Sequence, residues 1–157
     1  MRIGMGYDIH RLVAGRKLVL GGVRVDFTMG LLGHSDGDAL LHAVIDACLG
    51  AAGLGDIGEM FPDTDPRYKD ADSAALLREA LRRVAAAGFA VHNLDCIVYA
   101  EKPRLGPLKA QIRAGLAAVL SLDEARVNVK AKTMEGLGRI GEHEAIAAHA
   151  VVLLEEK

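Results

Sequence analysis

The sequence predicts an α+β fold in a single domain, residues 1–157, with a mixed β-sheet covered on one face by helices. The chain has 157 residues and is 51% hydrophobic, which is enough for one substantial core but not for two domains. Gly21 and Gly22 separate two short apolar segments, the pattern of a β-hairpin. Segments with helical and strand periodicity are mixed without the strict alternation of a parallel α/β fold.

The strands are expected where apolar segments of strand length lie between turn residues. They span residues 2–10, 17–20, 23–27, 91–99, 127–132 and 146–154. The last of them is apolar on both faces, so both faces need a cover. Helices take one face, and we expect the other to pack against copies of the same chain, in a homo-oligomer with its sheets inside. A monomer whose own loops cover that face is the alternative.

The first helix is expected to begin near Asp38, with Ser35 or Asp36 as its cap, and to end near Gly50 or Gly53. Its apolar residues recur three and four positions apart, which is the helical period.

A second helix is expected from Ser73, its cap, to Gly88, and a third over residues 107–120. Between the first two helices lies an acidic, turn-rich segment, residues 55–66. Irregular segments of this length are uncommon in compact domains, so a functional role is expected for it.

Composition narrows the functional classes. The net charge is −2 without a basic run, so the chain is not expected to bind nucleic acid. Its longest apolar stretch is too short to span a bilayer, and no charged leader precedes the first strand, which predicts a cytoplasmic protein. Cys48 and Cys96 lack Cys-x-x-Cys spacing and are expected to be reduced core thiols.

Three of the six histidines lie in two short segments, 7–10 and 34–42. Residues two apart on a strand share a face, so Asp8 and His10 can bind one ion, and a facing helix supplies His42. Two nitrogens and one carboxylate oxygen are the ligands of a catalytic zinc with an open fourth position. One face of the helix carries Asp38, His42 and Asp46 at four-residue steps. We expect Asp46 either to accept a hydrogen bond from the His42 ring nitrogen that does not bind the metal, or to be exposed.

Four motifs occur in order along essentially the whole chain. They are Asp8-x-His10, His34-Ser35-Asp36-Gly37-Asp38-x-x-x-His42, Gly55-Asp56-Ile57-Gly58-x-x-Phe61-Pro62-Asp63-Thr64-Asp65 and Lys130-Ala131-Lys132-Thr133-x-Glu135. Together they resemble the 2-C-methyl-D-erythritol 2,4-cyclodiphosphate synthase family of the non-mevalonate isoprenoid pathway. The resemblance implies a homotrimer with active sites between subunits. It also implies that a small molecule, 4-diphosphocytidyl-2-C-methyl-D-erythritol 2-phosphate, is converted to the cyclic diphosphate and CMP.

The resemblance also implies roles for individual residues. Zinc would be bound by Asp8, His10 and His42, and Glu135 would bind a magnesium or manganese ion that bridges the substrate diphosphate. His34 and Thr133 are expected to stabilise the transition state. The 2-phosphate would be held by His34 and Ser35, and the erythritol moiety by Asp56, Ile57, Gly58, Phe61, Pro62, Asp63, Thr64 and Asp65. The cytidine pocket of the adjacent subunit would be formed by Ala100, Pro103, Arg104, Leu105, Gly106, Lys132, Thr133, Met134 and Glu135. The wider substrate-binding set includes Asp8, Ile9, His10, Ala131 and Arg139.

The chain departs from the family pattern after the Leu-Gly pair at 137–138. Where many relatives have Phe-x-Gly-Arg-x-Glu, this sequence has Arg139-Ile140-Gly141-Glu142-His143-Glu144. The aromatic residue and the arginine of an axial pocket that can bind isoprenoid diphosphates are therefore absent. We expect Arg139 and Glu142 to pair across subunits, and isoprenoid diphosphates to bind weakly.

Other interpretations stay open at the level of sequence. Thr133 could be an ordinary strand residue, and residues 63–66 could be a simple turn. A metal-dependent phosphohydrolase would use the same ligands to activate water, and a non-enzymatic metal-binding or scaffold protein would also hold an ion.

Overall fold

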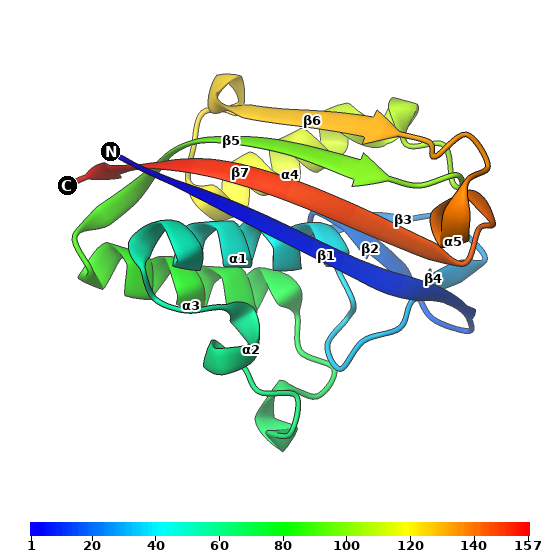
Figure 1. The fold of residues 1–157 in the computed structure, drawn as a ribbon, viewed down its shortest axis with the longest axis horizontal. Helices are drawn as coiled ribbons and strands as arrows, with labels where there is room; N and C mark the ends of the chain where they lie inside the picture. The colour runs from blue at the N-terminus through cyan, green and yellow to red at the C-terminus, as the bar shows by residue number, and fades with distance from the viewer.

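The computed structural model describes all 157 residues. A five-stranded sheet with the order β4-β1-β7-β5-β6 is covered on one face by three long helices (Figure 1). Only the β5–β6 pair is parallel, so the sheet is mixed and the predicted α+β fold is confirmed. The sheet strands are β1 (Arg2–Ala14), β4 (Met29–Leu31), β5 (Phe89–Tyr99), β6 (Val127–Lys132) and β7 (Ala145–Glu156).

Two short strands form the predicted hairpin outside the main sheet, β2 (Leu18–Leu20) and β3 (Val23–Val25). The long helices are α1 (Ala39–Ala52), α3 (Ser73–Ala86) and α4 (Lys109–Leu120). The short helices are α2 (Ile57–Met60), α5 (Gly138–Gly141) and the 3₁₀ turns η1 (Pro66–Tyr68), η2 (Gly106–Leu108) and η3 (Glu124–Arg126). None of the helices has the length and hydropathy needed to cross a membrane.

Helix α1 lies directly against strand β1, because glycines in the strand remove the side chains that would separate them. A Cβ atom on Gly6 would lie 1.9 Å from the carbonyl oxygen of Ala43, and one on Gly4 would lie 2.0 Å from that of Ala47. Almost every residue of α1 is buried between the sheet and α3. This close contact fixes the position of His42 relative to β1.

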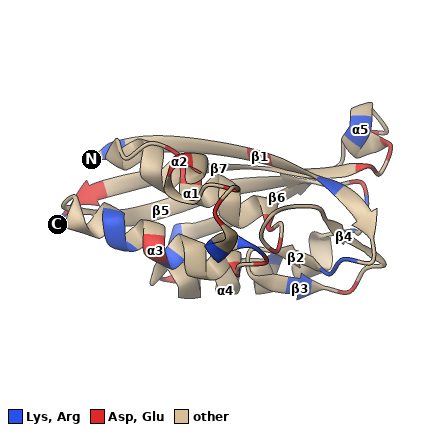
Figure 2. Cartoon of the chain, turned by 90° about the horizontal axis from the view of Figure 1, so that it is seen from below, with Lys and Arg blue, Asp and Glu red and all other residues tan.

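On the second face of the sheet, α5 projects only at the end where β7 begins, and no helix lies over the rest of that face (Figure 2). Ile3 and Met5 are 74% and 71% exposed there, and Tyr7, Ile9 and Val151 are exposed beside them. The alternative in which the chain's own loops cover this face is therefore wrong. A large open apolar face of this kind marks an interaction surface.

The first helix begins at Ala39, next to the predicted Asp38, but its predicted cap is wrong. The N-cap of α1 is Asp38, whose carboxylate accepts the backbone N–H groups of Leu40 and Leu41. Ser35 and Asp36 do not bond the first turn of the helix and are directed toward Ser73 and His42 instead.

Other boundaries also differ from prediction. The N-cap of α3 is Asp72, and Ser73 is the first helical residue. Strand β1 continues past His10 to Ala14, where it pairs with β4, a strand too short to give a sequence signal. The segment predicted to be irregular, residues 55–66, contains α2 and the start of η1.

Candidate metal centre and substrate pockets

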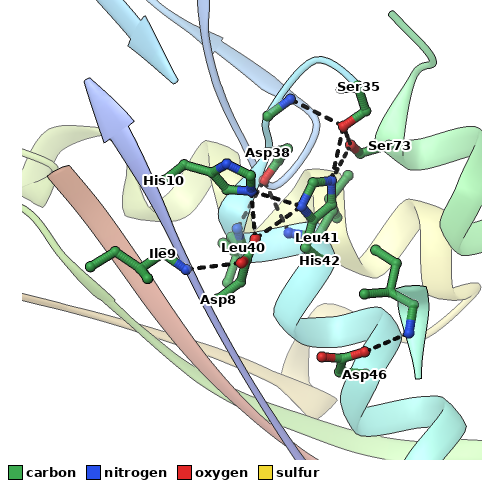
Figure 3. A network of polar contacts seen from close by, with 12 residues as sticks. Asp8, Ile9, His10, Ser35, Asp38, Leu40, Leu41, His42, Asp46 and Ser73 are labelled. Atoms are coloured by element: carbon green, nitrogen blue, oxygen red, sulfur yellow. Dashed lines mark hydrogen bonds and ion pairs between the residues drawn. The ribbon is translucent and has the colours of Figure 1, made fainter. Parts of the chain in front are cut away.

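Three predicted ligands meet between β1 and α1 (Figure 3). The Oδ2 atom of Asp8 lies 2.8 Å from Nε2 of His10 and 2.9 Å from Nδ1 of His42, and the two ring nitrogens are 3.1 Å apart. Strand alternation places Asp8 and His10 on the helix-facing side, as predicted. The group is partly buried and could hold a metal ion.

The start of α1 is fixed by Asp38, which is fully buried. Besides the helical N–H groups, its carboxylate accepts the backbone N–H groups of Gly21 and Gly22 in the hairpin turn, at 3.0 and 2.7 Å. Asp38, which the sequence placed on one face of the helix, is thus a buried residue that links the hairpin to the helix by hydrogen bonds. His42 lies one turn further along α1 and is oriented by this anchor.

The contacts of His10 suit metal binding by its neutral ring. Nδ1 of His10 lies 2.6 Å from the carbonyl oxygen of Leu32, which can only accept, so this nitrogen donates. In the protonated ring Nε2 donates to Asp8, and in the neutral ring Nε2 keeps a lone pair for a metal. Burial acts to raise the pKa of Asp8, but its hydrogen bonds from His10 and His42 outweigh burial and hold that pKa well below its usual range. Burial acts to lower the pKa of His10, but the bond to Asp8 outweighs it and raises that pKa. An ionised carboxylate between two imidazoles is a donor set that fits zinc.

Neither prediction for Asp46 is correct. Its carboxylate accepts the backbone N–H of Ile57 at 2.8 Å and holds the start of α2. The far nitrogen of His42 instead lies 3.0 Å from both the Ser35 and the Ser73 hydroxyl oxygens. Sequence reasoning missed Ser73, because it is far from the motif along the chain and reads as an ordinary helix start.

A pocket of about 430 Å³ opens from the metal ligands. It brings the predicted phosphate-binding residues to the predicted erythritol-binding loop. Its lining includes His34, Ser35, Ile57, Gly58, Phe61, Pro62 and Asp63. Four other predicted residues do not line it: Ile9 lies on the open sheet face, Asp56 caps α2, Asp65 pairs with Arg67, and Thr64 is exposed at the loop.

A second pocket of about 900 Å³ lies at the ends of β5 and β6. It contains most of the predicted cytidine-binding set, namely Ala100, Pro103, Arg104, Leu105, Gly106, Lys132 and Thr133, together with Ala131 of the wider substrate-binding set. Strands β1 and β6 are three steps apart in the sheet order, or about 14 Å at the usual strand spacing. Within one chain, the predicted cytidine pocket is therefore separate from the metal ligands.

The loop after β6 is held by a residue whose role was not predicted. The carboxylate of Glu101 accepts the backbone N–H groups of Met134 at 2.9 Å and Gly136 at 3.0 Å. Thr133 follows the end of β6, and its hydroxyl donates to Glu135 at 2.8 Å. The loop that carries Thr133 and Glu135 is thus an ordered turn and not part of a strand.

The segment that differs from the family pattern, residues 139–144, contains ion pairs within the chain. Arg139 lies 2.7 Å from a carboxylate oxygen of Glu144 and 3.7 Å from one of Glu142. Both acids lie within reach of Arg139 inside the chain because α5 is so short, and the expected pairing across subunits stays a prediction. Arg139, Met134 and Glu135 lie outside the lining of the second pocket.

Comparisons with known proteins agree with this geometry. The model of the YgbB family matches residues 1–155. The chain is 59% identical, over the whole of both chains, to a 2-C-methyl-D-erythritol 2,4-cyclodiphosphate synthase of Geobacter sulfurreducens. A solved synthase of that name, in a CDP-bound form, has a TM-score of 0.91 at 44% identity and covers 98% of this chain and 100% of its own. The bifunctional IspDF of Campylobacter jejuni has a TM-score of 0.95 at 47% identity and covers 99% of this chain, which spans 42% of that longer protein.

Proposed function

This chain belongs to the YgbB family, and we propose that it acts as a 2-C-methyl-D-erythritol 2,4-cyclodiphosphate synthase of the non-mevalonate isoprenoid pathway. It converts 4-diphosphocytidyl-2-C-methyl-D-erythritol 2-phosphate to the cyclic diphosphate and CMP. Residues 1–157 then form one synthase domain. The observation that carries the proposal is the meeting of Asp8, His10 and His42 at a pocket lined by the 57–63 segment.

The metals of the proposal follow from the chemistry of the donors. Zinc would be held by Asp8, His10 and His42, since two imidazoles and one carboxylate leave its fourth position open. Glu135 would hold magnesium or manganese, which prefer carboxylate oxygen. When bound, the two ions supply positive charge that polarises the substrate diphosphate.

The protein residues supply binding and orientation, because the nucleophile belongs to the substrate. The 2-phosphate is held by His34 and Ser35 in the pocket beside the metal ligands and attacks the β-phosphorus, which releases CMP. The enzyme is therefore a phosphorus-oxygen lyase. Fixing the attacking oxygen in line with the breaking bond can be worth an effective molarity on the order of 10⁵ M, so the phosphate outcompetes water. In the proposal, His34 and Thr133 stabilise the transition state.

The proposed assembly is a homotrimer whose open sheet faces are turned inward. The exposed apolar face of β1 and β7 supports it, since such a surface needs a cover. The separation of the two pockets within one chain supports it too, because an adjacent subunit could bring its Thr133 pocket to the metal ligands. Cys48 and Cys96 are buried and free, which suits the proposed cytoplasmic location.

Product analysis tests the proposal against the phosphohydrolase alternative. The purified, metal-loaded protein is incubated with the cytidine-linked substrate in isotopically labelled water. The synthase gives CMP and an unlabelled cyclic diphosphate without inorganic phosphate. A linear product that contains oxygen from the labelled water, or release of inorganic phosphate, would establish a hydrolase instead.

A further inference from the structure

The ring of His42 faces two different environments (Figure 3). Its Nδ1 atom faces Asp8 and His10, and its Nε2 atom lies 3.0 Å from the hydroxyl oxygens of both Ser35 and Ser73. A neutral imidazole has one ring proton, so the nitrogen that holds it decides whether Nδ1 can bind a metal. The Asp8 carboxylate at Nδ1 and the two serines at Nε2 therefore compete to set the tautomer.

The hydroxyl of Ser73 has a fixed direction. It donates its only proton to Oδ1 of Asp36, so its oxygen can serve His42 only as an acceptor. Ser73 is fully buried, so its hydroxyl cannot form a hydrogen bond with solvent instead. An acceptor at Nε2 favours the ring proton on that nitrogen and the lone pair on Nδ1. It thereby opposes the Asp8 carboxylate, which lies 2.9 Å from Nδ1 and favours the proton there.

Asp36 in turn can act only as an acceptor. Its carboxylate receives the Ser73 hydroxyl, the Ser73 backbone N–H at 3.1 Å and the Asp38 backbone N–H at 3.1 Å. All three partners are donors, so the direction of donation runs from His42 through Ser73 to Asp36. The start of α3 and the loop before α1 hold this chain of bonds in place.

Ser35 lies at the same distance from His42 but is not locked in this way. Its oxygen accepts the backbone N–H of Gly37 at 3.2 Å, and no carboxylate takes its proton. Ser35 also lines the pocket beside the metal ligands, which Ser73 does not. Its hydroxyl proton is therefore available to a ligand in that pocket.

We infer that Ser73, locked by Asp36, is a positioning residue that accepts the Nε2–H of His42 and thereby favours the tautomer whose Nδ1 lone pair is directed at the metal position. Ser35 is thereby released to donate its hydroxyl to a phosphate. This inference rests on the proposed function and deepens it, since it divides the two serines between the metal ligand and the substrate.

Two variants of equal size test it, Ser73→Ala and Ser35→Ala. Each removes one buried hydroxyl 3.0 Å from the same nitrogen, so any difference comes from the lock by Asp36. Zinc affinity is measured by competition with a chromogenic chelator, and the tautomer of His42 by nitrogen NMR of the zinc-free protein. Ser73→Ala should lose zinc affinity by about tenfold or more and hold a larger share of the Nδ1–H tautomer than the wild type. Ser35→Ala should keep zinc affinity within a few-fold of the wild type and keep the wild-type share of the two tautomers.

Equal losses of zinc affinity in the two variants, or an unchanged share of the Nδ1–H tautomer in Ser73→Ala, would overturn the inference. If Ser73→Ala does not fold, Asp36→Asn replaces it, because an amide cannot accept at both oxygen positions and should also raise the share of the Nδ1–H tautomer. Both readouts are independent of turnover. If the variants behave as expected but the wild type forms no cyclic product, the proposed function is contradicted and this inference stands.

Discussion

Asp8 determines the charge of the metal centre, because it is the only carboxylate among the three converging ligands. With a divalent zinc and two neutral imidazoles, one carboxylate leaves a net charge of about +1 at the ion. A positive centre with an open coordination position attracts a phosphate oxygen. A second carboxylate would cancel that charge and weaken the attraction.

Replacing His42 with Ala should strip the zinc, since it removes one of three protein ligands. Elemental analysis of the purified variant should show less than a tenth of the wild-type zinc content. His92→Ala is the matched control, because His92 pairs with Glu155 away from the centre and its loss should leave zinc content unchanged. Full zinc occupancy in His42→Ala would refute the proposed ligand set.

Zinc retention should fall as the pH drops from 8 to 6. The bond to Asp8 raises the pKa of His10 above its ordinary value of 6.5, so a proton competes with zinc at higher pH than it would at a free imidazole. Asp8 has a lowered pKa and stays ionised across this range, so it adds nothing to the dependence. Chelator competition at several pH values measures this, and an affinity independent of pH would exclude His10 as a ligand.

At the scale of the residue, the sequence predicted the ligands well, because strand alternation places Asp8 and His10 on one face whatever the rest of the fold does. It could not predict the partners of His42. Ser73 reaches His42 only through the packing of α3 beside α1, and no local spacing encodes that contact.

At the scale of the element, the contact between β1 and α1 depends on glycine. Gly6→Ala should destabilise the protein by about 3 kcal/mol, because the new Cβ would meet the rigid backbone carbonyl of Ala43. Gly50→Ala is the control, since it lies exposed in α1 with open space around it and should be stabilising by up to about 1 kcal/mol. Denaturant unfolding measures both variants, and equal stabilities would show that β1 and α1 can separate freely.

The turn after β6 should depend on Glu101. Glu101→Ala leaves the N–H groups of Met134 and Gly136 without their acceptor, so the turn with Thr133 and Glu135 should loosen. We expect catalytic turnover to fall about tenfold or more while zinc content stays unchanged, because the residues proposed to bind zinc line the other pocket. Glu124→Ala, which removes only an exposed pair with Arg113, should have little effect. Loss of zinc from Glu101→Ala would show that the two pockets are coupled within the chain.

The long elements were predicted because their periodicity is local, whereas the short ones were not. Strand β4 exists because β1 extends past His10 and offers it a partner, and α5 exists because the chain must turn between β6 and β7. Caps were misplaced for a similar reason. Ser35, Asp36 and Asp38 could each cap α1, and tertiary contacts with the hairpin and α3 decide that Asp38 does.

At the scale of the whole molecule, the open sheet face should hold the trimer together. The wild type should sediment as a trimer, and Met5→Glu should shift it to smaller species, because it places a charge on the exposed apolar face. Gln111→Glu adds the same charge on α4, on the covered side of the sheet, and should remain trimeric. A wild type that sediments as a fully active monomer would contradict the assembly.

The same arrangement requires each active site to combine two chains. A His42→Ala chain keeps its Thr133 pocket, and a Thr133→Ala chain keeps its metal ligands, so neither is active alone. In trimers formed by co-expressing equal amounts, about one quarter of the interfaces should pair an intact metal centre with an intact Thr133 pocket, which predicts about a quarter of wild-type activity. Co-expressing Asp8→Ala with His42→Ala should restore nothing, because both changes damage a centre that lies wholly within one chain. If the mixture of His42→Ala and Thr133→Ala chains is as inactive as the mixture of Asp8→Ala and His42→Ala chains, the metal centre and Thr133 act from the same subunit. The chain would then have to change conformation to bring its two pockets together.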